Sequence, residues 1–168
     1  MRLARFRVLL VVALVALAAR AGAAVIAARL VWNDTASVPP GLYLRRPMLP
    51  ADVGRTVILP IPVSVRLLVD ERRYLPLDHD LMKVVVAMPG DRVCLDGHDY
   101  RVNGRVIGAV RDADSRGRRL DPYRFCGEVP TGQAFLATSA PLSFDSRYFG
   151  PVPLAALTVV RPLWTYSH

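Results

Sequence analysis

The chain has 168 residues, which is enough for one domain with a substantial hydrophobic core. Five of its 22 basic residues precede the first acidic residue, Asp34, and the remaining 17 stand against 14 acidic residues. The formal charge of +8 is therefore concentrated at the N-terminus, and this distribution argues against a nucleic-acid partner.

Residues 1–32 combine positive charge with a long apolar stretch. Three arginines lie within the first seven residues, and apolar residues then run over 8–28, broken only by Arg20. The pattern fits either a secretory signal cleaved near 21–23 or an uncleaved anchor long enough to cross a membrane. We favour the anchor, which implies contact with membrane lipid. By the positive-inside rule the N-terminus is then cytoplasmic, and residues 33–168 form a domain outside the cytoplasm.

The segment just after this stretch contains a candidate nucleophile. Val38 precedes Pro39-Pro40-Gly41 and is pushed toward an extended conformation, and the prolines predict a rigid turn. Ser37 is therefore held on a stiff backbone that presents its hydroxyl. Thr35 would project to the same side if this segment is extended. The alternative is a polar linker beside the membrane.

The only lysine of the chain, Lys83, lies in an apolar run. The other seven residues from Leu81 to Met88 are apolar and Pro-Gly-Asp follows them, a pattern typical of a buried strand that ends in a turn. All 21 other basic residues are arginines, which stay protonated, whereas a desolvated lysine can lose its proton near neutral pH. We interpret Lys83 as a side chain that must titrate. The alternative is a lysine whose ammonium group reaches out to water.

The rest of the chain predicts a mostly β domain with one short inserted amphipathic helix within 63–75. Asn103-Gly104 is typical of a tight hairpin turn. Strands are expected at 55–60, 92–95, 100–102, 105–107, 134–138 and 157–160, and a solvated hairpin tip at 111–119.

Two cysteines, Cys94 and Cys126, lack the spacing and the histidine partners of a metal site. An even number in an exported domain favours a disulfide between them. Two buried free thiols are the alternative.

Near the C-terminus, Ser143, Asp145 and Arg147 alternate along the chain. In an extended strand the three polar side chains would share one face. They form either an ordinary salt-bridged strand end or a group that orients a nearby amine.

Four blocks, taken in order, resemble the type I signal peptidase superfamily of serine–lysine proteases, in particular its TraF-like conjugative-transfer peptidases. They are the basic start with its apolar anchor and residues 35–43, 83–91 and 143–152. General signal peptidases carry a Gly-Asp-Asn-Arg-like run before the last block, whereas this chain has Ala-Thr-Ser-Ala-Pro-Leu at 137–142. That departure favours the conjugative subfamily over a housekeeping enzyme.

The resemblance implies a signal-peptidase-like β catalytic domain in the periplasm, anchored by one helix in the bacterial inner membrane. It implies a pilin precursor with small residues before the cut as substrate, cyclisation of the product in some members, and no cofactor or metal. The residues that match family positions are Ser37 as nucleophile, Lys83 as general base, Thr35 with the Ser37 backbone N–H as the oxyanion hole, and Ser143, Asp145 and Arg147 as support for the lysine.

Two other hypotheses remain open from the sequence. One is a Ser–His–Asp hydrolase that pairs Ser37 with His79, a residue flanked by Asp78 and Asp80 in an expected turn. The other is a non-catalytic envelope component that uses the same β fold as an interaction module.

Overall fold

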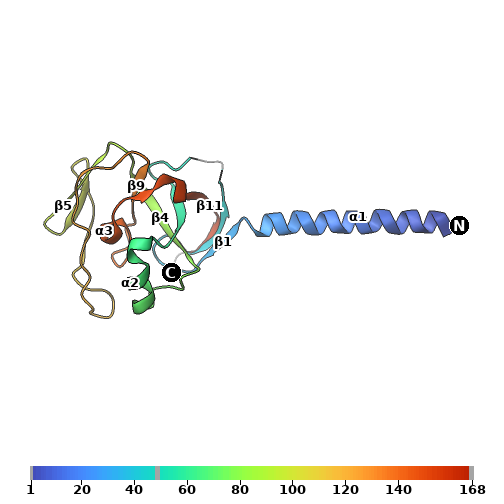
Figure 1. Cartoon of the computed structure of the whole chain (residues 1–168), viewed down its shortest axis with the longest axis horizontal. Coiled ribbons are helices and arrows are strands. Elements are labelled where there is room, and N and C mark those ends of the chain that lie inside the picture. Colours follow the sequence, from blue (N-terminus) through green and yellow to red (C-terminus); the bar gives the residue numbers. More distant parts are fainter. Residues whose placement is uncertain (1, 48–49, 167–168) are drawn as a thin grey trace.

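The computed structural model describes residues 2–47 and 50–166. Helix α1 (Arg2–Ala27) projects as a single rod from the β domain that holds the rest of the chain (Figure 1). Its segment Leu10–Ala27 is long and apolar enough to cross a membrane, and none of it is buried against the domain. The predicted anchor is therefore one continuous helix that contains Arg20.

Seven strands form the larger sheet, in the order β1-β2-β11-β3-β4-β9-β10. Every neighbouring pair is antiparallel, and the last strand of the chain, β11, lies between β2 and β3. Gly41 makes the pairing of β2 with β11 possible, because a Cβ at this position would clash with the carbonyl oxygen of Trp164. The strands are β1 (Leu30–Asn33), β2 (Gly41–Arg45), β3 (Thr56–Pro60), β4 (Asp80–Ala87), β9 (Gln133–Ala137), β10 (Val152–Pro153) and β11 (Thr158–Thr165).

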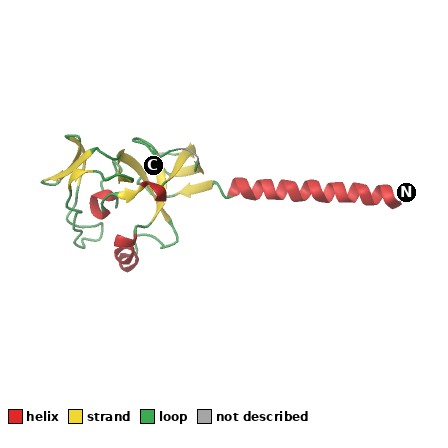
Figure 2. Cartoon of the chain, turned by 45° about the horizontal axis from the view of Figure 1, so that its top comes forward, coloured by secondary structure: helices red, strands yellow, loops and turns green. Residues whose placement is uncertain are grey.

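Four strands form a smaller antiparallel sheet at the end of the domain away from α1 (Figures 1 and 2). The expected hairpin turn is confirmed: Asn103 and Gly104 both have positive φ, 48° and 81°. The expected disulfide is also present, and it joins β5 to β8 at directly paired positions, Cys94 and Cys126. The strands are β5 (Arg92–Asp96), β6 (Asp99–Val102), β7 (Arg105–Ala109) and β8 (Cys126–Glu128).

Short helices interrupt the strands. The inserted helix expected between β3 and β4 is a 3-10 turn, η1 (Val63–Val65), followed by α2 (Arg66–Arg72). Two more, α3 (Ser146–Phe149) and η2 (Leu154–Ala156), lie between β9 and β11. The fold is thus mostly β with an N-terminal apolar helix, as predicted.

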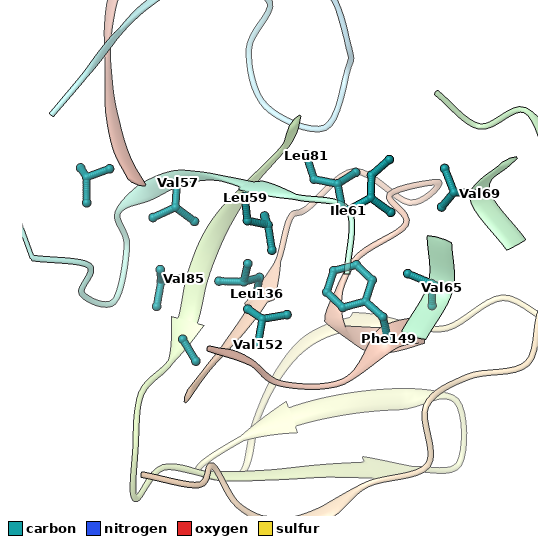
Figure 3. Close-up of a cluster of buried hydrophobic side chains, with 12 residues drawn as sticks. Val57, Leu59, Ile61, Val65, Val69, Leu81, Val85, Leu136, Phe149 and Val152 are labelled. Atoms are coloured by element: carbon teal, nitrogen blue, oxygen red, sulfur yellow. The ribbon is translucent and has the colours of Figure 1, made fainter. Parts of the chain in front are cut away.

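The main core lies on one face of the larger sheet. Figure 3 shows side chains from β3, β4 and β9 meeting there, with η1 and α2 contributing from one side. Leu81 and Val85 belong to this cluster, whereas Met82 packs on a different one, so β4 is covered on both faces. The apolar packing expected on both faces of this strand is therefore confirmed, with polar groups only around Lys83 and the exposed start of the strand at Asp80. The labelled members of the cluster are Val57, Leu59, Ile61, Val65, Val69, Leu81, Val85, Leu136, Phe149 and Val152.

The segment 111–119 is a largely exposed hairpin tip, as its charges suggested, and a bridge between Ala113 and Arg119 closes it; Asp114 is the exception. The Asp114 carboxylate is nearly buried, forming ion pairs with Arg118 at 2.8 Å and Arg72 at 3.6 Å. It also accepts a hydrogen bond from the Tyr74 hydroxyl at 2.8 Å. These contacts dock the loop on the end of α2, because charged and hydroxyl donors from both segments converge on one carboxylate. Nothing in the sequence of the loop indicates this convergence.

Candidate active site

Ser37 lies in the turn that connects β1 to β2. The loop is closed by antiparallel pairing of Asn33 with Gly41, and the Val38 side chain is buried against Tyr43 and Ile58 beneath it. Ser37 itself is half-buried. The buried Val38 side chain fixes the loop to the sheet, and the two prolines after it stiffen the backbone, in agreement with the rigid turn that the sequence predicts.

The sequence interpretation considered an extended backbone from Thr35 to Ser37. The structure shows a bent backbone there instead. It bends at Thr35 and turns at 36–37. The Thr35 hydroxyl donates a hydrogen bond to Oδ1 of Asn33 at 2.7 Å, and the Thr35 backbone N–H lies 3.2 Å from the same oxygen. An asparagine that binds the backbone two residues on favours a turn over an extended chain, which explains the difference.

Lys83 brings its amine to Ser37 from β4, which is separated from β2 by β11 and β3 in the larger sheet. It lies on β4 opposite Val57 of β3. Its Nζ is 2.8 Å from Ser37 Oγ and 3.0 Å from Ser143 Oγ, and the residue is only 3% exposed. The amine therefore does not reach solvent, and its two side-chain partners are hydroxyl groups.

The surroundings of Lys83 favour its neutral form. Burial lowers the pKa of Lys83 from 10.5 to about 8, with the positive charge of Arg147 contributing in the same direction. The negative charge of Asp145 opposes this shift. The desolvation cost of the ammonium outweighs the attraction, since no carboxylate contacts the amine directly.

Asp145 and Arg147 form a buried pair next to the lysine. The Arg147 guanidinium donates to both carboxylate oxygens of Asp145, at 2.8 Å from Nε and 2.7 Å from Nη2. Asp145 also accepts from the backbone N–H of Thr138 and of Arg147, the latter as N-cap of α3. The carboxylate is fully occupied by this pairing.

The three polar residues near the C-terminus do not lie on a strand. Ser143 is in a loop, Asp145 caps α3, and Arg147 lies within it. The helical turn brings Arg147 back onto the carboxylate of Asp145, which caps the helix. The sequence therefore grouped these residues correctly, but the extended strand that it suggested for them is wrong. Ser143 contacts Lys83, whereas Asp145 and Arg147 reach it only through their charges.

A cleft of about 880 Å³ opens over Ser37 and Lys83. Its walls come from β1, from the segment before β4, and from the docked loop that carries Asp114. His79 is exposed in the wall, in a bend before β4, and the hydrogen bond to Ser37 comes from Lys83 instead. Mixed apolar and polar lining along an open cleft suits an extended peptide.

One buried polar residue of the site escaped the sequence interpretation. Asn33 is 4% exposed and its amide nitrogen lies 3.0–3.3 Å from three carbonyl oxygens of the Ser37 loop. An asparagine at the end of an apolar strand, just before a turn, is the signal that could have found it.

The chemistry available is acyl transfer by a Ser–Lys pair. A hydroxyl within hydrogen-bond distance of an amine with a lowered pKa has a base that can take its proton. Across residues 2–47 and 50–166, no three histidine, cysteine, aspartate or glutamate side chains are grouped to hold a metal ion.

Comparison with protein families gives a match over nearly the whole chain. The family described as signal peptidase, peptidase S26, matches residues 2–163. A plasmid transfer protein TraF from Escherichia coli is 37% identical over 158 residues, which cover 87% of this chain and 88% of the relative.

A second relative and one solved structure give shorter or weaker matches. The conjugal transfer protein TraF of Agrobacterium fabrum (strain C58 / ATCC 33970) is 41% identical over 94 residues, 52% of this chain, so the match spans about half (50%) of that relative's length. A signal peptidase I structure from Enterococcus faecalis V583 aligns with 71% of this chain and 98% of its own, at 19% identity and a TM-score of 0.39.

Proposed function

This chain belongs to the signal peptidase S26 family, and from that premise we propose that it is a membrane-anchored serine peptidase that removes a leader segment from an exported precursor. The observation that carries the proposal is the 2.8 Å contact between Lys83 Nζ and Ser37 Oγ inside a peptide-sized cleft. Cleavage by this pair needs no histidine.

Ser37 acts as the nucleophile and Lys83 as the general base. The neutral amine takes the proton from Ser37 Oγ as that oxygen attacks the scissile carbonyl carbon. The resulting ammonium then gives the proton to the leaving amine, and an acyl-enzyme on Ser37 remains. Water, activated by the same amine, hydrolyses the ester and restores both residues.

Thr35 and the Ser37 backbone N–H form the oxyanion hole in this proposal. The Thr35 hydroxyl donates its proton to Asn33 Oδ1 in the structure. The proton turns to the carbonyl oxygen when negative charge develops there. Asn33 Oδ1 keeps the Thr35 backbone N–H as a donor during this step.

Ser143, Asp145 and Arg147 support the lysine. Ser143 gives the amine a second hydroxyl partner, at 3.0 Å from Nζ to Oγ, which fixes its direction. The internal pairing of Asp145 with Arg147 leaves no carboxylate free to bind the ammonium and stabilise it. The amine consequently stays easy to deprotonate.

The relatives are named as conjugal and plasmid transfer proteins, and the family resemblance favours a conjugative pilin precursor with small residues before the cut as substrate. Residues 1–32 serve as the anchor, with a cytoplasmic N-terminus in the bacterial inner membrane, and residues 33–168 form the periplasmic peptidase domain. Ring closure needs a cut at the C-terminal end of the pilin, so that the pilin itself is the acyl group on Ser37; its own N-terminal amine then attacks the ester in place of water, and the Ser37 hydroxyl leaves. A housekeeping-type signal peptidase would hydrolyse the ester only.

The test uses the full-length chain in detergent with a serine-reactive inhibitor and a candidate pilin precursor. We expect labelling and cleavage by the wild type, and neither with Ser37→Ala. Ser64→Ala, which alters an exposed hydroxyl in η1, is the matched control and should retain both. Labelling that persists in Ser37→Ala would contradict the assignment. Mass spectrometry of the product distinguishes a linear from a circular pilin.

A further inference from the structure

We propose that Asn33 is a positioning residue that holds the Ser37 loop in its reactive geometry. The inference rests on the proposed function of Ser37, and it adds a residue outside the nucleophile, base and oxyanion groups. Asn33 does not contact the reacting atoms. It acts on them through the backbone of the loop.

The Asn33 amide is engaged on all sides. Nδ2 donates to the carbonyl oxygens of Thr35 at 3.0 Å, Val38 at 3.1 Å and Pro39 at 3.3 Å, so two amide hydrogens are shared among three acceptors. Oδ1 accepts from the Thr35 backbone N–H at 3.2 Å and from its hydroxyl at 2.7 Å. Donors face acceptors at every contact, which fixes the orientation of the amide.

These contacts lie on both sides of Ser37. Thr35 precedes the nucleophile by two residues, whereas Val38 and Pro39 follow it directly. One buried side chain therefore ties together the two ends of the turn that carries the hydroxyl. Pro39 O receives a second donor, the Tyr43 hydroxyl at 2.6 Å, so the far end of the turn is held from β2 as well.

The position of the turn decides the reaction geometry. Lys83 is fixed on an interior strand of the larger sheet, and its amine also contacts Ser143 Oγ at 3.0 Å. The distance from Nζ to Ser37 Oγ then depends on where the loop places Ser37. A displacement of about 1 Å at a reacting group can cost about 10²-fold in rate. Without the Asn33 amide, three carbonyls of the loop would lose a donor and the turn would be free to shift.

The test compares neutral substitutions at two loop-holding asparagines in the full-length chain. Asn33→Ser shortens the side chain so that it cannot span the turn, and Asn33→Gln moves the amide by one methylene. Asn103 is the matched control, because it also holds a turn, through Nδ2 to Asp91 and Oδ1 from the Arg92 N–H, but in the smaller sheet. Asn103→Ser and Asn103→Gln make the same chemical changes there.

We measure kcat and KM on a precursor, the rate of Ser37 labelling, and thermal unfolding to correct for the folded fraction. For Asn33→Ser we expect kcat to fall about 10- to 100-fold and labelling to slow in parallel, with KM within about twofold of the wild type. The Asn103 variants should keep kcat, whatever their stability. A purely structural role would move stability at both sites and kcat at neither.

Two outcomes separate the failures. If the wild type shows no Ser37-dependent activity, the proposed function is wrong and this inference falls with it. If the wild type is active and folded Asn33→Ser keeps kcat within about twofold, only the positioning role is overturned. Should Asn33→Ser not fold, folded Asn33→Gln decides by the same criterion.

Discussion

The two sheets of this domain differ in how deeply their charged side chains are buried. The larger sheet encloses Lys83, and the segment after β9 encloses Asp145 and Arg147, all at 3% exposure or less. In the smaller sheet, the ion pair of Arg101 with Asp96 is open to solvent, with side chains 38% and 73% exposed. A buried amine is destabilising but reactive, whereas exposed charges cost little and do no chemistry.

The sheets also differ in what holds them together. The smaller one is closed by the disulfide between Cys94 and Cys126. Both sheets pack on apolar clusters, the smaller one through Val93 and Tyr100, and in the larger one buried hydrogen bonds of polar groups such as Lys83 are added to that packing. The two sheets meet where Tyr100 of β6 packs on Phe135 of β9. Beside them, Arg147 of α3 donates from Nη1 to the carbonyl oxygen of Ala109 in β7, and Gly108 leaves room for the guanidinium. Function should therefore follow changes in the larger sheet, and stability should follow changes in both.

The largest expected effect is the loss of cleavage in Lys83→Arg. Arginine cannot release its proton to become a base, so kcat should fall to the background level although the charge is kept. Peptide cleavage by the purified, folded variant is the measurement. His79→Ala, which changes an exposed imidazole in the same cleft, should keep most of the activity. Strong cleavage by Lys83→Arg, or its loss in His79→Ala, would contradict the Ser–Lys assignment.

The disulfide should matter for stability and not for chemistry. Replacing both Cys94 and Cys126 by serine opens a loop with a sequence separation of 32 residues. In the chain-entropy description this lowers the free energy of unfolding by about 3–4 kcal/mol. Urea unfolding of the full-length chain measures the loss, and kcat is compared at a temperature where both proteins are folded. A drop in kcat without a loss of stability would contradict the claim that the smaller sheet contributes to stability and not to catalysis.

The buried amine should make stability depend on pH. Lys83 has a pKa of about 8 in the folded chain against an ordinary value of 10.5. Between these values the unfolded chain binds more protons, so stability rises with pH there and the cost of the buried charge disappears. Relative to Lys83→Met, the wild type should gain about 3 kcal/mol from pH 7 to pH 11.

Urea unfolding of both proteins across that range is the measurement, and effects common to both cancel in the difference. The rate of cleavage should rise over the lower part of the same range, with a midpoint near pH 8, because only the neutral amine accepts the Ser37 proton. A difference between the two proteins that does not change with pH would mean that Lys83 is solvated.

The smallest of the four effects is expected for Thr35→Val. Loss of one oxyanion donor should lower kcat by roughly 10²-fold and leave KM and the unfolding temperature nearly unchanged. Thr35→Ser keeps the hydroxyl and should be mild. Full activity in Thr35→Val would leave only backbone N–H groups as oxyanion donors.

Residue pattern was enough to find the two central residues. Lys83 was identified as the sole lysine in an apolar strand, and Ser37 as a hydroxyl beside two prolines. The structure joins them at 2.8 Å, although the sequence offers no distance between residues 46 positions apart. Their catalytic roles stay predictions until the variants are measured.

The sequence predicts which residues lie together better than it predicts the backbone conformation that brings them together. Asp145 and Arg147 are paired as expected, but through a helix cap, since alternation alone does not distinguish a strand from a capped turn. Docking of Asp114 on α2 was missed because charged residues in a loop usually face solvent.

The sequence by itself determined the N-terminal apolar helix, the mostly β fold, the hairpin turn at Asn103-Gly104 and the cysteine pair, because each depends on composition, period or local backbone preference. Only the tertiary structure decided that Asn33 is buried under the Ser37 loop and that Ser143, among the three residues expected to support Lys83, contacts its amine directly. Those contacts join segments that are brought together by the strand order and register of the sheet. The free energy that favours the contacts comes from burial in a core, which no local sequence pattern describes.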